Sequence, residues 1–428
     1  MKVLCLLSVL FVAVNSLPVN EFNGKNWVVL VAGSNSWFNY RHQADVYHAY
    51  QIVKKNGIPD ENIIVMHYDD IANNKANKFP GKVFNHPSHK DVYPGVPKDY
   101  TGKEVTPENF LKVLAGDQGL KNEGKKVLES GPNDHVFIFF DDHGAPDLVA
   151  FPNKYLYSGP LLTTLKQMHQ DKKYGKLVFY IEACEAGSMF ANLPDNINIY
   201  ATTAANGKES SYAIYNDATV GTYLGDEYSV NWMENAEAAP AETLQQQFDV
   251  TKTKTKGSHV QHFGDLTIAS LPISQFLGMF LYNGLCHSKS SVEVTSDDNT
   301  LVNNKDFPLV MAQQSADYQE LSVLSTARQF LDTVFEEYVN SIQHLMNANN
   351  DVFNTRLELN NRECYHNFVD TFNDQCLSIS QHTYALNKLY TFVNICEQLD
   401  DSSATQALNQ LVQYCQQNLS NGYPTNIV

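Results

Sequence analysis

The sequence predicts an α/β domain with a mainly parallel sheet, followed by a separate all-helical domain. The first prediction rests on short apolar runs that alternate with helical patterns along most of the chain. Such alternation forms crossover units, which place their strands in parallel. The second rests on a change after residue 305, beyond which apolar residues recur at spacings of three and four. A chain of 428 residues is long enough for both domains.

Five apolar runs are predicted to form the strands of the sheet. Most of them are rich in branched or aromatic side chains, and unbroken runs of this kind suit strands that are covered on both faces. The runs are Trp27–Ala32, Ile63–His67, Val136–Phe140, Leu177–Ile181 and Ile197–Ala201.

Helical spacing and capping residues predict the helices of the first domain. Thr106 is a predicted N-cap, with Pro107 in the first helical position. The segment Ile71–Thr106 is rich in Pro, Gly, Asn and His and has no period, so we expect a large loop. The predicted helices are Ala44–Lys55, Pro107–Leu114, Gly159–His169, Thr243–Thr255 and Pro272–Leu281.

The two domains are predicted to be joined by an exposed linker. Ser288–Lys305 is polar and aperiodic. A helical stripe then runs from Leu321 to Leu345, and shorter stripes follow at Leu386–Val393 and Ala407–Tyr414. We therefore divide the chain into a first domain at residues 17–287, a linker at 288–307 and a helical domain at 308–428.

The amino terminus predicts entry into the secretory pathway. Residues 1–16, MKVLCLLSVLFVAVNS, have a basic start, an apolar run too short for a typical spanning helix, and small residues that fit cleavage after Ser16. The competing interpretation is an amino-terminal core element. No later stretch is predicted to span a bilayer, so we expect a lysosomal, vacuolar or secreted protein without a membrane partner.

Composition and charge narrow the classes of partner. The apolar content of 43% is ordinary for a globular protein, and the net charge of −17 argues against nucleic acid. His86 and His89 suggest a metal, but we expect a solvated loop and no metal or cofactor.

Four of the seven cysteines cluster in the helical domain. In a secreted protein this even set predicts two disulfides, with three possible connectivities, whereas zinc is disfavoured because there is no CxxC pair. Cys286 has no obvious partner, and Asn418 begins a glycosylation sequon. The clustered cysteines are Cys364, Cys376, Cys396 and Cys415.

Two of the predicted strands end in residues that suit nucleophilic catalysis. Val136–Phe140 leads to His143 and Gly144, and Leu177–Ile181 leads to Cys184. Adjacent parallel strands lie about 5 Å apart, so the side chains at their carboxyl ends can meet. A histidine can then activate the thiol, and the amides of Gly144 and Cys184 can form an oxyanion hole. The alternative is a buried core cysteine beside an ordinary histidine.

Several stretches together resemble the legumain family of asparaginyl endopeptidases, called vacuolar processing enzymes in plants. The resemblance is dense over Asn26–Gly278 and looser in the helical domain. It implies a caspase-like fold with a six-stranded sheet, a helical inhibitory prodomain, Cys184 as nucleophile, His143 as base and Asn39 as the residue that orients the imidazole. The matching stretches are Val31–Asn35, Asn39–Asp45, Asp142–Gly144, Glu182–Ser188, Tyr200–Asn206 and Val230–Met233.

The resemblance also implies a pocket that reads the asparagine side chain. Arg41 is expected to bind the amide carbonyl, while Glu182 and Asp226 accept from the amide nitrogen. Their arrangement predicts that an aspartate substrate binds only when it is protonated. His42, Ser210 and Ser211 are expected close by.

The sequence departs from the family pattern at three positions near the site. Asp147 stands where many relatives carry glycine, and Ala186 replaces a common serine. Glu227 stands where relatives often carry an aromatic residue, which puts a further charge near the pocket and leaves peptide joining in doubt.

A protease with a trailing helical domain suggests a proenzyme. We expect the helical domain to cover the cleft through charge pairs that weaken on acidification. Asn303 and Asn304 fit the enzyme's own specificity and are candidate sites of self-cleavage. The alternatives are a peptide ligase that uses the same site, and a non-catalytic inhibitor or binding protein. The resemblance makes cystatin-type inhibitors candidate partners, and a monomer is expected.

Overall fold

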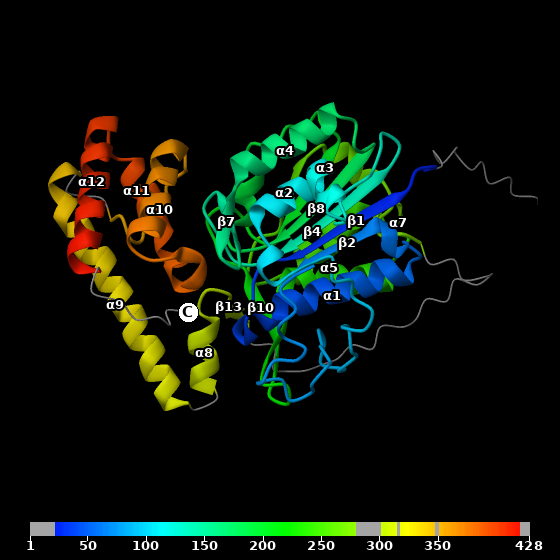
Figure 1. Cartoon of the computed structure of the whole chain (residues 1–428), viewed down its shortest axis with the longest axis horizontal. Helices are drawn as coiled ribbons and strands as arrows, with labels where there is room; N and C mark the ends of the chain where they lie inside the picture. The colour runs from blue at the N-terminus through cyan, green and yellow to red at the C-terminus, as the bar shows by residue number, and fades with distance from the viewer. Residues whose placement is uncertain (1–21, 280–300, 315–316, 347–350, 420–428) are drawn as a thin grey trace, which may run out of the picture.

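The computed structural model describes residues 22–279, 301–314, 317–346 and 351–419. Within them the chain folds into an α/β domain beside a helical domain (Figure 1). The segment predicted as a signal peptide and Cys286 lie outside the described residues. No helix in the described ranges has the length and hydropathy needed to cross a membrane.

The α/β domain is built on a seven-stranded sheet in the order β12-β9-β8-β4-β1-β2-β3. All neighbours are parallel except β12, which pairs antiparallel with β9 at one edge. All five predicted strands are present, and the sheet exceeds the six strands expected because β3 is a two-residue edge strand. The bounds are β1 Asn26–Ala32, β2 Ile63–His67, β3 Tyr100–Thr101, β4 His135–Asp141, β8 Lys176–Glu182, β9 Ile199–Thr203 and β12 Gln261–Gly264.

Helices cover both faces of this sheet (Figure 1). In β1, Val28 and Leu30 join the core on the side of α1 and α5, while Val29 and Val31 join the core on the side of α2 and α4. This alternation explains why the strands are apolar throughout, since both faces are buried. The helices are α1 Tyr40–Lys55, α5 Glu227–Ala238, α6 Leu244–Lys254 and α7 Ser274–Leu277 on one side, and α2 Pro107–Ala115, α3 Gln118–Asn122 and α4 Ser158–Gln170 on the other.

The helix with a predicted N-cap, α2, begins where the sequence places it. Thr106 accepts from the Asn109 amide, as a predicted N-cap should. By contrast, α1 starts four residues before the predicted Ala44, because its first turn buries polar side chains that break the apolar period. The helix predicted at Pro272–Leu281 is wrong in extent: α7 spans Ser274–Leu277 and ends at Gly278, whose φ is 76°.

Two small antiparallel sheets were not predicted. One consists of β5 Gly144–Ala145, β6 Leu148–Phe151 and β7 Lys154–Tyr157, and the other of β11 Thr222–Asp226, β10 Tyr212–Asp217 and β13 Val302–Asn303. Strand β13 belongs to the segment predicted as an exposed linker. That prediction is wrong here, because Val302 is buried and Asn304 and Lys305 are 1% and 2% exposed.

The helical domain comprises α8 Phe307–Gln314, α9 Tyr318–Ile342, α10 Arg362–Gln375, α11 Leu389–Cys396 and α12 Asp401–Asn418. Its core includes two disulfides. One joins Cys364 to Cys396, the other Cys376 to Cys415, so α10 is tied to both α11 and α12. Asn418, the predicted glycosylation site, is the last residue of α12, and its side-chain nitrogen donates to the Tyr414 carbonyl.

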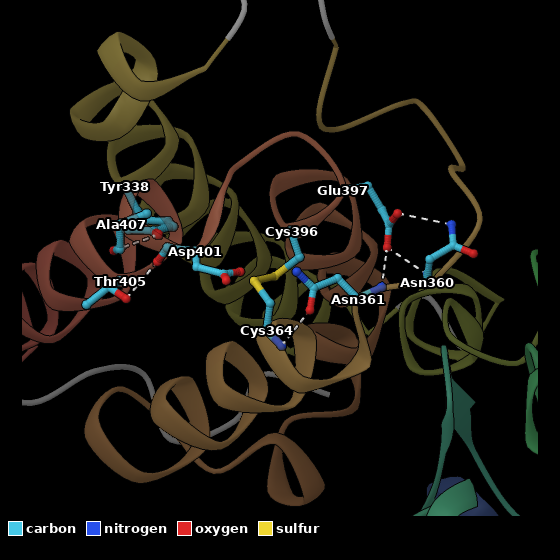
Figure 2. Close-up of a disulfide and its surroundings, with 9 residues drawn as sticks. All are labelled: Tyr338, Asn360, Asn361, Cys364, Cys396, Glu397, Asp401, Thr405 and Ala407. Carbon is cyan, nitrogen blue, oxygen red and sulfur yellow. Dashed lines mark hydrogen bonds between the residues drawn. A yellow bond between two sulfur atoms is a disulfide. The ribbon is translucent and has the colours of Figure 1, made fainter.

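Hydrogen bonds reinforce the first disulfide (Figure 2). Asn361 caps α10 by accepting from the Cys364 amide at 3.2 Å. The Glu397 carboxylate, next to Cys396 in the chain, accepts from the amides of Asn360 and Asn361 at 2.7 Å. The loop before α10 is thereby fixed to the end of α11.

Candidate active site

The site lies where β4 and β8 end side by side. Asp141 pairs with Glu182 in the ladder, and the Asp142 amide then donates to the Glu182 carbonyl at 3.1 Å. His143 and Cys184 each follow two residues after these strand ends. Gly144 lies against the same turn: a methyl group there would sit 2.2 Å from the Cys184 carbonyl oxygen, so only glycine fits.

The imidazole of His143 is held in one tautomer. Asn39 donates its side-chain nitrogen to the Asn35 carbonyl at 2.9 Å, which leaves the Asn39 oxygen as an acceptor. That oxygen lies 2.8 Å from His143 Nε2, which therefore carries the proton. His143 Nδ1 is buried without a hydrogen-bond partner in the described part of the chain. Burial, with the Arg41 charge next, lowers the pKa of His143 well below its usual value, so the ring is a neutral base.

The Cys184 thiol is fully buried and free of any disulfide. Its sulfur accepts from the Ser211 amide at 3.3 Å and lies 3.8 Å from the Ser211 hydroxyl. Burial raises the pKa of Cys184 to about 11, although the Lys305 ammonium opposes that rise. The sulfur is therefore a thiol and not a thiolate while the site is covered.

Arg41 lies at the centre of a buried charged pocket. Its Nε is 3.0 Å from Asp226 Oδ1, and its Nη1 donates to the Phe38 carbonyl. Burial raises the pKa of Asp226, and Arg41 limits the rise. His42 is the second buried histidine of the site, after His143. Its Nδ1 is 2.7 Å from the Ser34 hydroxyl, and burial lowers its pKa well below the usual value.

Glu182 occupies the same pocket but contacts another element. Its Oε2 accepts from the Ser229 amide at 3.1 Å and from the Ser229 hydroxyl at 2.9 Å, both in the first turn of α5. Burial, followed by repulsion from Asp226, raises the pKa of Glu182 well above its usual value. Its Oε1 has no partner in the described part of the chain, so one oxygen remains for a ligand.

The pocket is filled by the chain's own Asn304. Arg41 Nε donates to the Asn304 side-chain oxygen at 3.1 Å, and the Asn304 side-chain nitrogen donates to the Ser211 hydroxyl at 2.8 Å. The Asn304 amide bonds the Ser211 carbonyl, which extends the pairing of β13 with β10. Asn303 behaves differently, because its side-chain oxygen accepts from the Lys305 amide within the same segment. Ser210, half-buried, precedes Ser211 in the chain.

Three polar residues of the site were not predicted. Asp45 accepts from the Asp226 amide at 2.9 Å and from Asn85 at 2.6 Å. Asp141 is fully buried near Asp45, and repulsion from the Asp45 carboxylate contributes to the raised pKa of Asp141. Burial raises the pKa of both carboxyl groups well above the usual value. Ser229 is the third. Asp45 lies four residues after Arg41 on α1, a spacing that places both on one helix face and was the available clue.

The departures from the family pattern have distinct surroundings. Glu227 accepts from the amides of Lys256 and Gly257 at 2.7 and 2.9 Å, so its charge braces a loop instead of facing the pocket. Asp147 has a φ of 63° and meets α10: Arg362 Nε is 3.2 Å from Oδ1, and His366 Nε2 is 2.7 Å from Oδ2. Ala186 begins a buried 3-10 turn after Glu185.

Possible metal ligands in the described residues gather at the pocket itself. The groups His42–Asp142–His143 and His42–Asp141–Asp226 each have ligand atoms within 4.8 Å of one another. The loop histidine His89 instead lies 2.5 Å from Asp217.

Comparison with known proteins gives consistent matches. Residues 26–279 match the sequence model of the peptidase C13 family, and residues 319–415 match that of the legumain prodomain. The chain is 47% identical to legumain from Mus musculus over 421 residues, covering 92% of this chain and 95% of the relative. It is 38% identical to the vacuolar-processing enzyme of Vicia sativa, over 88% of this chain and 83% of the relative.

Among solved structures, caspase-1 from Spodoptera frugiperda matches with a TM-score of 0.34 and 10% identity, over 57% of this chain and 88% of that one. This structural likeness is too slight to carry an argument, so the architecture rests on the strand order described above.

Proposed function

The chain belongs to the peptidase C13 family, and we propose that it hydrolyses the peptide bond after asparagine with Cys184 as nucleophile and His143 as general base. It is a legumain-type cysteine endopeptidase that carries a prodomain, so its substrates are proteins and peptides. The observation that carries the proposal is Asn304, whose side chain occupies the pocket beside Cys184 in a strand paired with β10.

The proposed reaction begins when the Cys184 thiol gives its proton to His143 Nδ1. The thiolate attacks the carbonyl carbon of the asparagine, and the amides of Gly144 and Cys184 stabilise the oxyanion. Collapse breaks the carbon–nitrogen bond, and the leaving amine takes the proton from His143. Water then adds to the thioester with His143 as base, which releases the acid and regenerates the thiol.

Specificity is proposed to come from Arg41 on the carbonyl side and from Ser211 and Asp226 on the amide side. Arg41 is a donor without acceptor capacity, so it selects an oxygen. The contacts of Asn304 support this assignment, and an interaction with Asn304 also lowers the pKa of Asp226. Glu182 is proposed to contribute through its unpartnered Oε1, which remains for a ligand, and through its Oε2, which accepts hydrogen bonds from Ser229.

Self-processing is proposed to occur after Asn304 and not after Asn303, because only Asn304 places its side chain in the pocket. The test compares Asn304→Gln with the matched Asn303→Gln in the full chain. One added methylene costs about ten-fold or more in a fitted pocket. We expect Asn304→Gln to slow cleavage at that position, as measured by mass spectrometry of the new termini after acid incubation. Slower cleavage in Asn303→Gln alone would reverse the assignment.

Release of the helical domain is proposed to involve the contacts of Asp147 with Arg362 and His366 on α10. The pair of Glu185 with Lys305 is proposed to oppose acid release. Burial raises the pKa of Glu185, so the covered form binds its proton more tightly, and acidification through that pKa favours the covered form.

The proposed setting is an acidic compartment of the secretory pathway, lysosomal or vacuolar, or the exterior of the cell. A relative named vacuolar-processing enzyme supports this assignment. Cystatin-type proteins are proposed inhibitors, and a monomer is the proposed state. Titration of activity with a cystatin and sedimentation of the full chain test these two proposals.

Cleavage of peptides that differ only at the cut position tests the central proposal. After acid incubation of the full chain, we expect peptides with asparagine to be cut and peptides with arginine or glutamine to be left. Preference for arginine would overturn the pocket assignment.

A further inference from the structure

The residue that follows Asn304 is held as firmly as Asn304 itself. Lys305 Nζ lies 2.6 Å from Glu185 Oε2, and the two side chains are only 3% and 5% exposed. A buried lysine is rare unless it is paired, so this contact is a built feature of the cleft. Glu185 directly follows Cys184, which places its carboxylate beside the proposed nucleophile.

The geometry of the segment defines which subsite Glu185 belongs to. Strand β13 pairs antiparallel with β10, and the Asn304 amide continues that pairing onto the Ser211 carbonyl. With Asn304 in the specificity pocket, Lys305 is the residue on the far side of the bond that the enzyme would cut. Glu185 therefore faces the first residue of the leaving fragment.

Glu185 belongs to the α/β domain, and the position of its backbone is fixed within that domain. Its φ is 50°, a left-handed value uncommon for this residue type, and its amide donates to the Glu209 carbonyl at 2.7 Å. These constraints come from the α/β domain alone, so they persist when another peptide replaces residues 302–305.

We propose that Glu185 forms a subsite for a cation, so that the enzyme prefers bonds in which the asparagine is followed by lysine or arginine. The inference rests on the proposed function and adds a second specificity position to it. A charge-assisted hydrogen bond in a largely buried site gives about ten-fold or more in discrimination.

The test uses the full chain after acid incubation and three quenched fluorogenic peptides that differ only in the residue after asparagine: lysine, glutamine or glutamate. The ratio of kcat/KM values within one enzyme preparation is independent of the amount of active enzyme. We expect lysine to exceed glutamine by about ten-fold and glutamate by more. Equal cleavage of all three overturns the inference and leaves the proposed function intact, whereas absence of cleavage after asparagine overturns the proposed function.

Variants assign the preference to Glu185. Glu185→Gln should reduce the lysine-to-glutamine ratio to about one, and Glu185→Lys should favour glutamate. The matched control is Glu108→Gln, an exposed carboxylate paired with Lys154 on the α/β domain, which should keep the ratio. A lysine preference that persists in Glu185→Gln overturns the assignment. If the variants fail to fold, the wild-type peptide ratios still decide whether the subsite exists.

Discussion

Two regions of the α/β domain contact later parts of the chain in different ways. One is the cleft at Cys184, which holds residues 302–305, and the other is the face around Asp147, which contacts α10. In the cleft, Asn304 and Lys305 are buried and make the contacts that we propose for a substrate. At Asp147, Arg362 and His366 of α10 are 33% and 25% exposed and touch none of the proposed catalytic groups. Changes in the cleft therefore alter inhibition and catalysis together, whereas changes at Asp147 alter inhibition alone.

The largest effect is expected for Cys184→Ala, which separates catalysis from the binding of Asn304 in the pocket. Cys184→Ala removes the nucleophile but none of the hydrogen bonds that hold Asn304, so both contact regions should persist. We expect activity to fall by about 10³-fold or more, with the 302–305 segment uncut in the variant incubated alone. Activity is measured on an asparagine peptide and cleavage by mass spectrometry.

Two controls accompany Cys184→Ala. Its melting temperature should match that of the uncleaved wild-type chain, and added active wild-type enzyme should process it. Self-cleavage at the wild-type rate would contradict the role of Cys184.

Arg41→Gln should weaken the cleft contact and catalysis together. It removes the guanidinium that donates to the asparagine carbonyl and breaks the ion pair with Asp226, so we expect kcat/KM for asparagine peptides to fall about 100-fold. The matched variant Arg41→Lys keeps the charge but not the geometry, and should lose less.

Circular dichroism of both Arg41 variants checks that they fold. Full activity in folded Arg41→Gln would remove Arg41 from the pocket assignment.

The pH dependence of aspartate cleavage sharpens the description of the cleft. Burial raises the pKa values of Glu182 and Asp226, and an aspartate substrate must gain a proton to resemble asparagine. Relative to asparagine, aspartate cleavage should therefore rise as the pH falls, by about ten-fold per unit above the substrate pKa. Paired peptides assayed between pH 4 and 7 give this ratio. A constant ratio would show that protonation is not the discriminating event.

The smallest expected effect lies at Asp147. Asp147→Gly removes the partner of Arg362 and His366, and glycine tolerates the φ of 63° at this position. Because the pairs are partly exposed, we expect about a five-fold faster release of activity on acid incubation. Activity toward peptides, once released, should equal that of the wild type. A loss of peptide activity would place Asp147 in the cleft rather than at the α10 contact.

The strands and the strand-end residues could be predicted because local patterns determine them. The run Leu177–Ile181 is apolar on both faces, and His143 and Cys184 follow strand ends that parallel pairing brings together. The buried acid Asp45 was not predictable in this way, because its burial depends on Asn85 and Asp226 from distant parts of the chain.

Residues 301–305 show the main limit of local reasoning. Their polar composition is typical of a linker, yet Asn304 and Lys305 are buried by the charges of a pocket assembled elsewhere. Similarly, α1 begins at Tyr40 because Arg41 and His42 face that pocket. Helical periodicity of apolar residues cannot predict this start, because the buried side chains are polar.

The covalent continuity of β13 with the rest of the chain has a kinetic consequence. A tethered segment is present at its site at an effective concentration of order millimolar, however dilute the protein is. Blockage by residues 302–305 is therefore a unimolecular property of each molecule, and diluting the proenzyme does not relieve it. A single cut after Asn304 would leave residues 302–304 attached to the α/β domain, whereas Lys305 and the helical domain beyond it would become a dissociable partner. Binding of that partner would then depend on concentration, so dilution would favour its release.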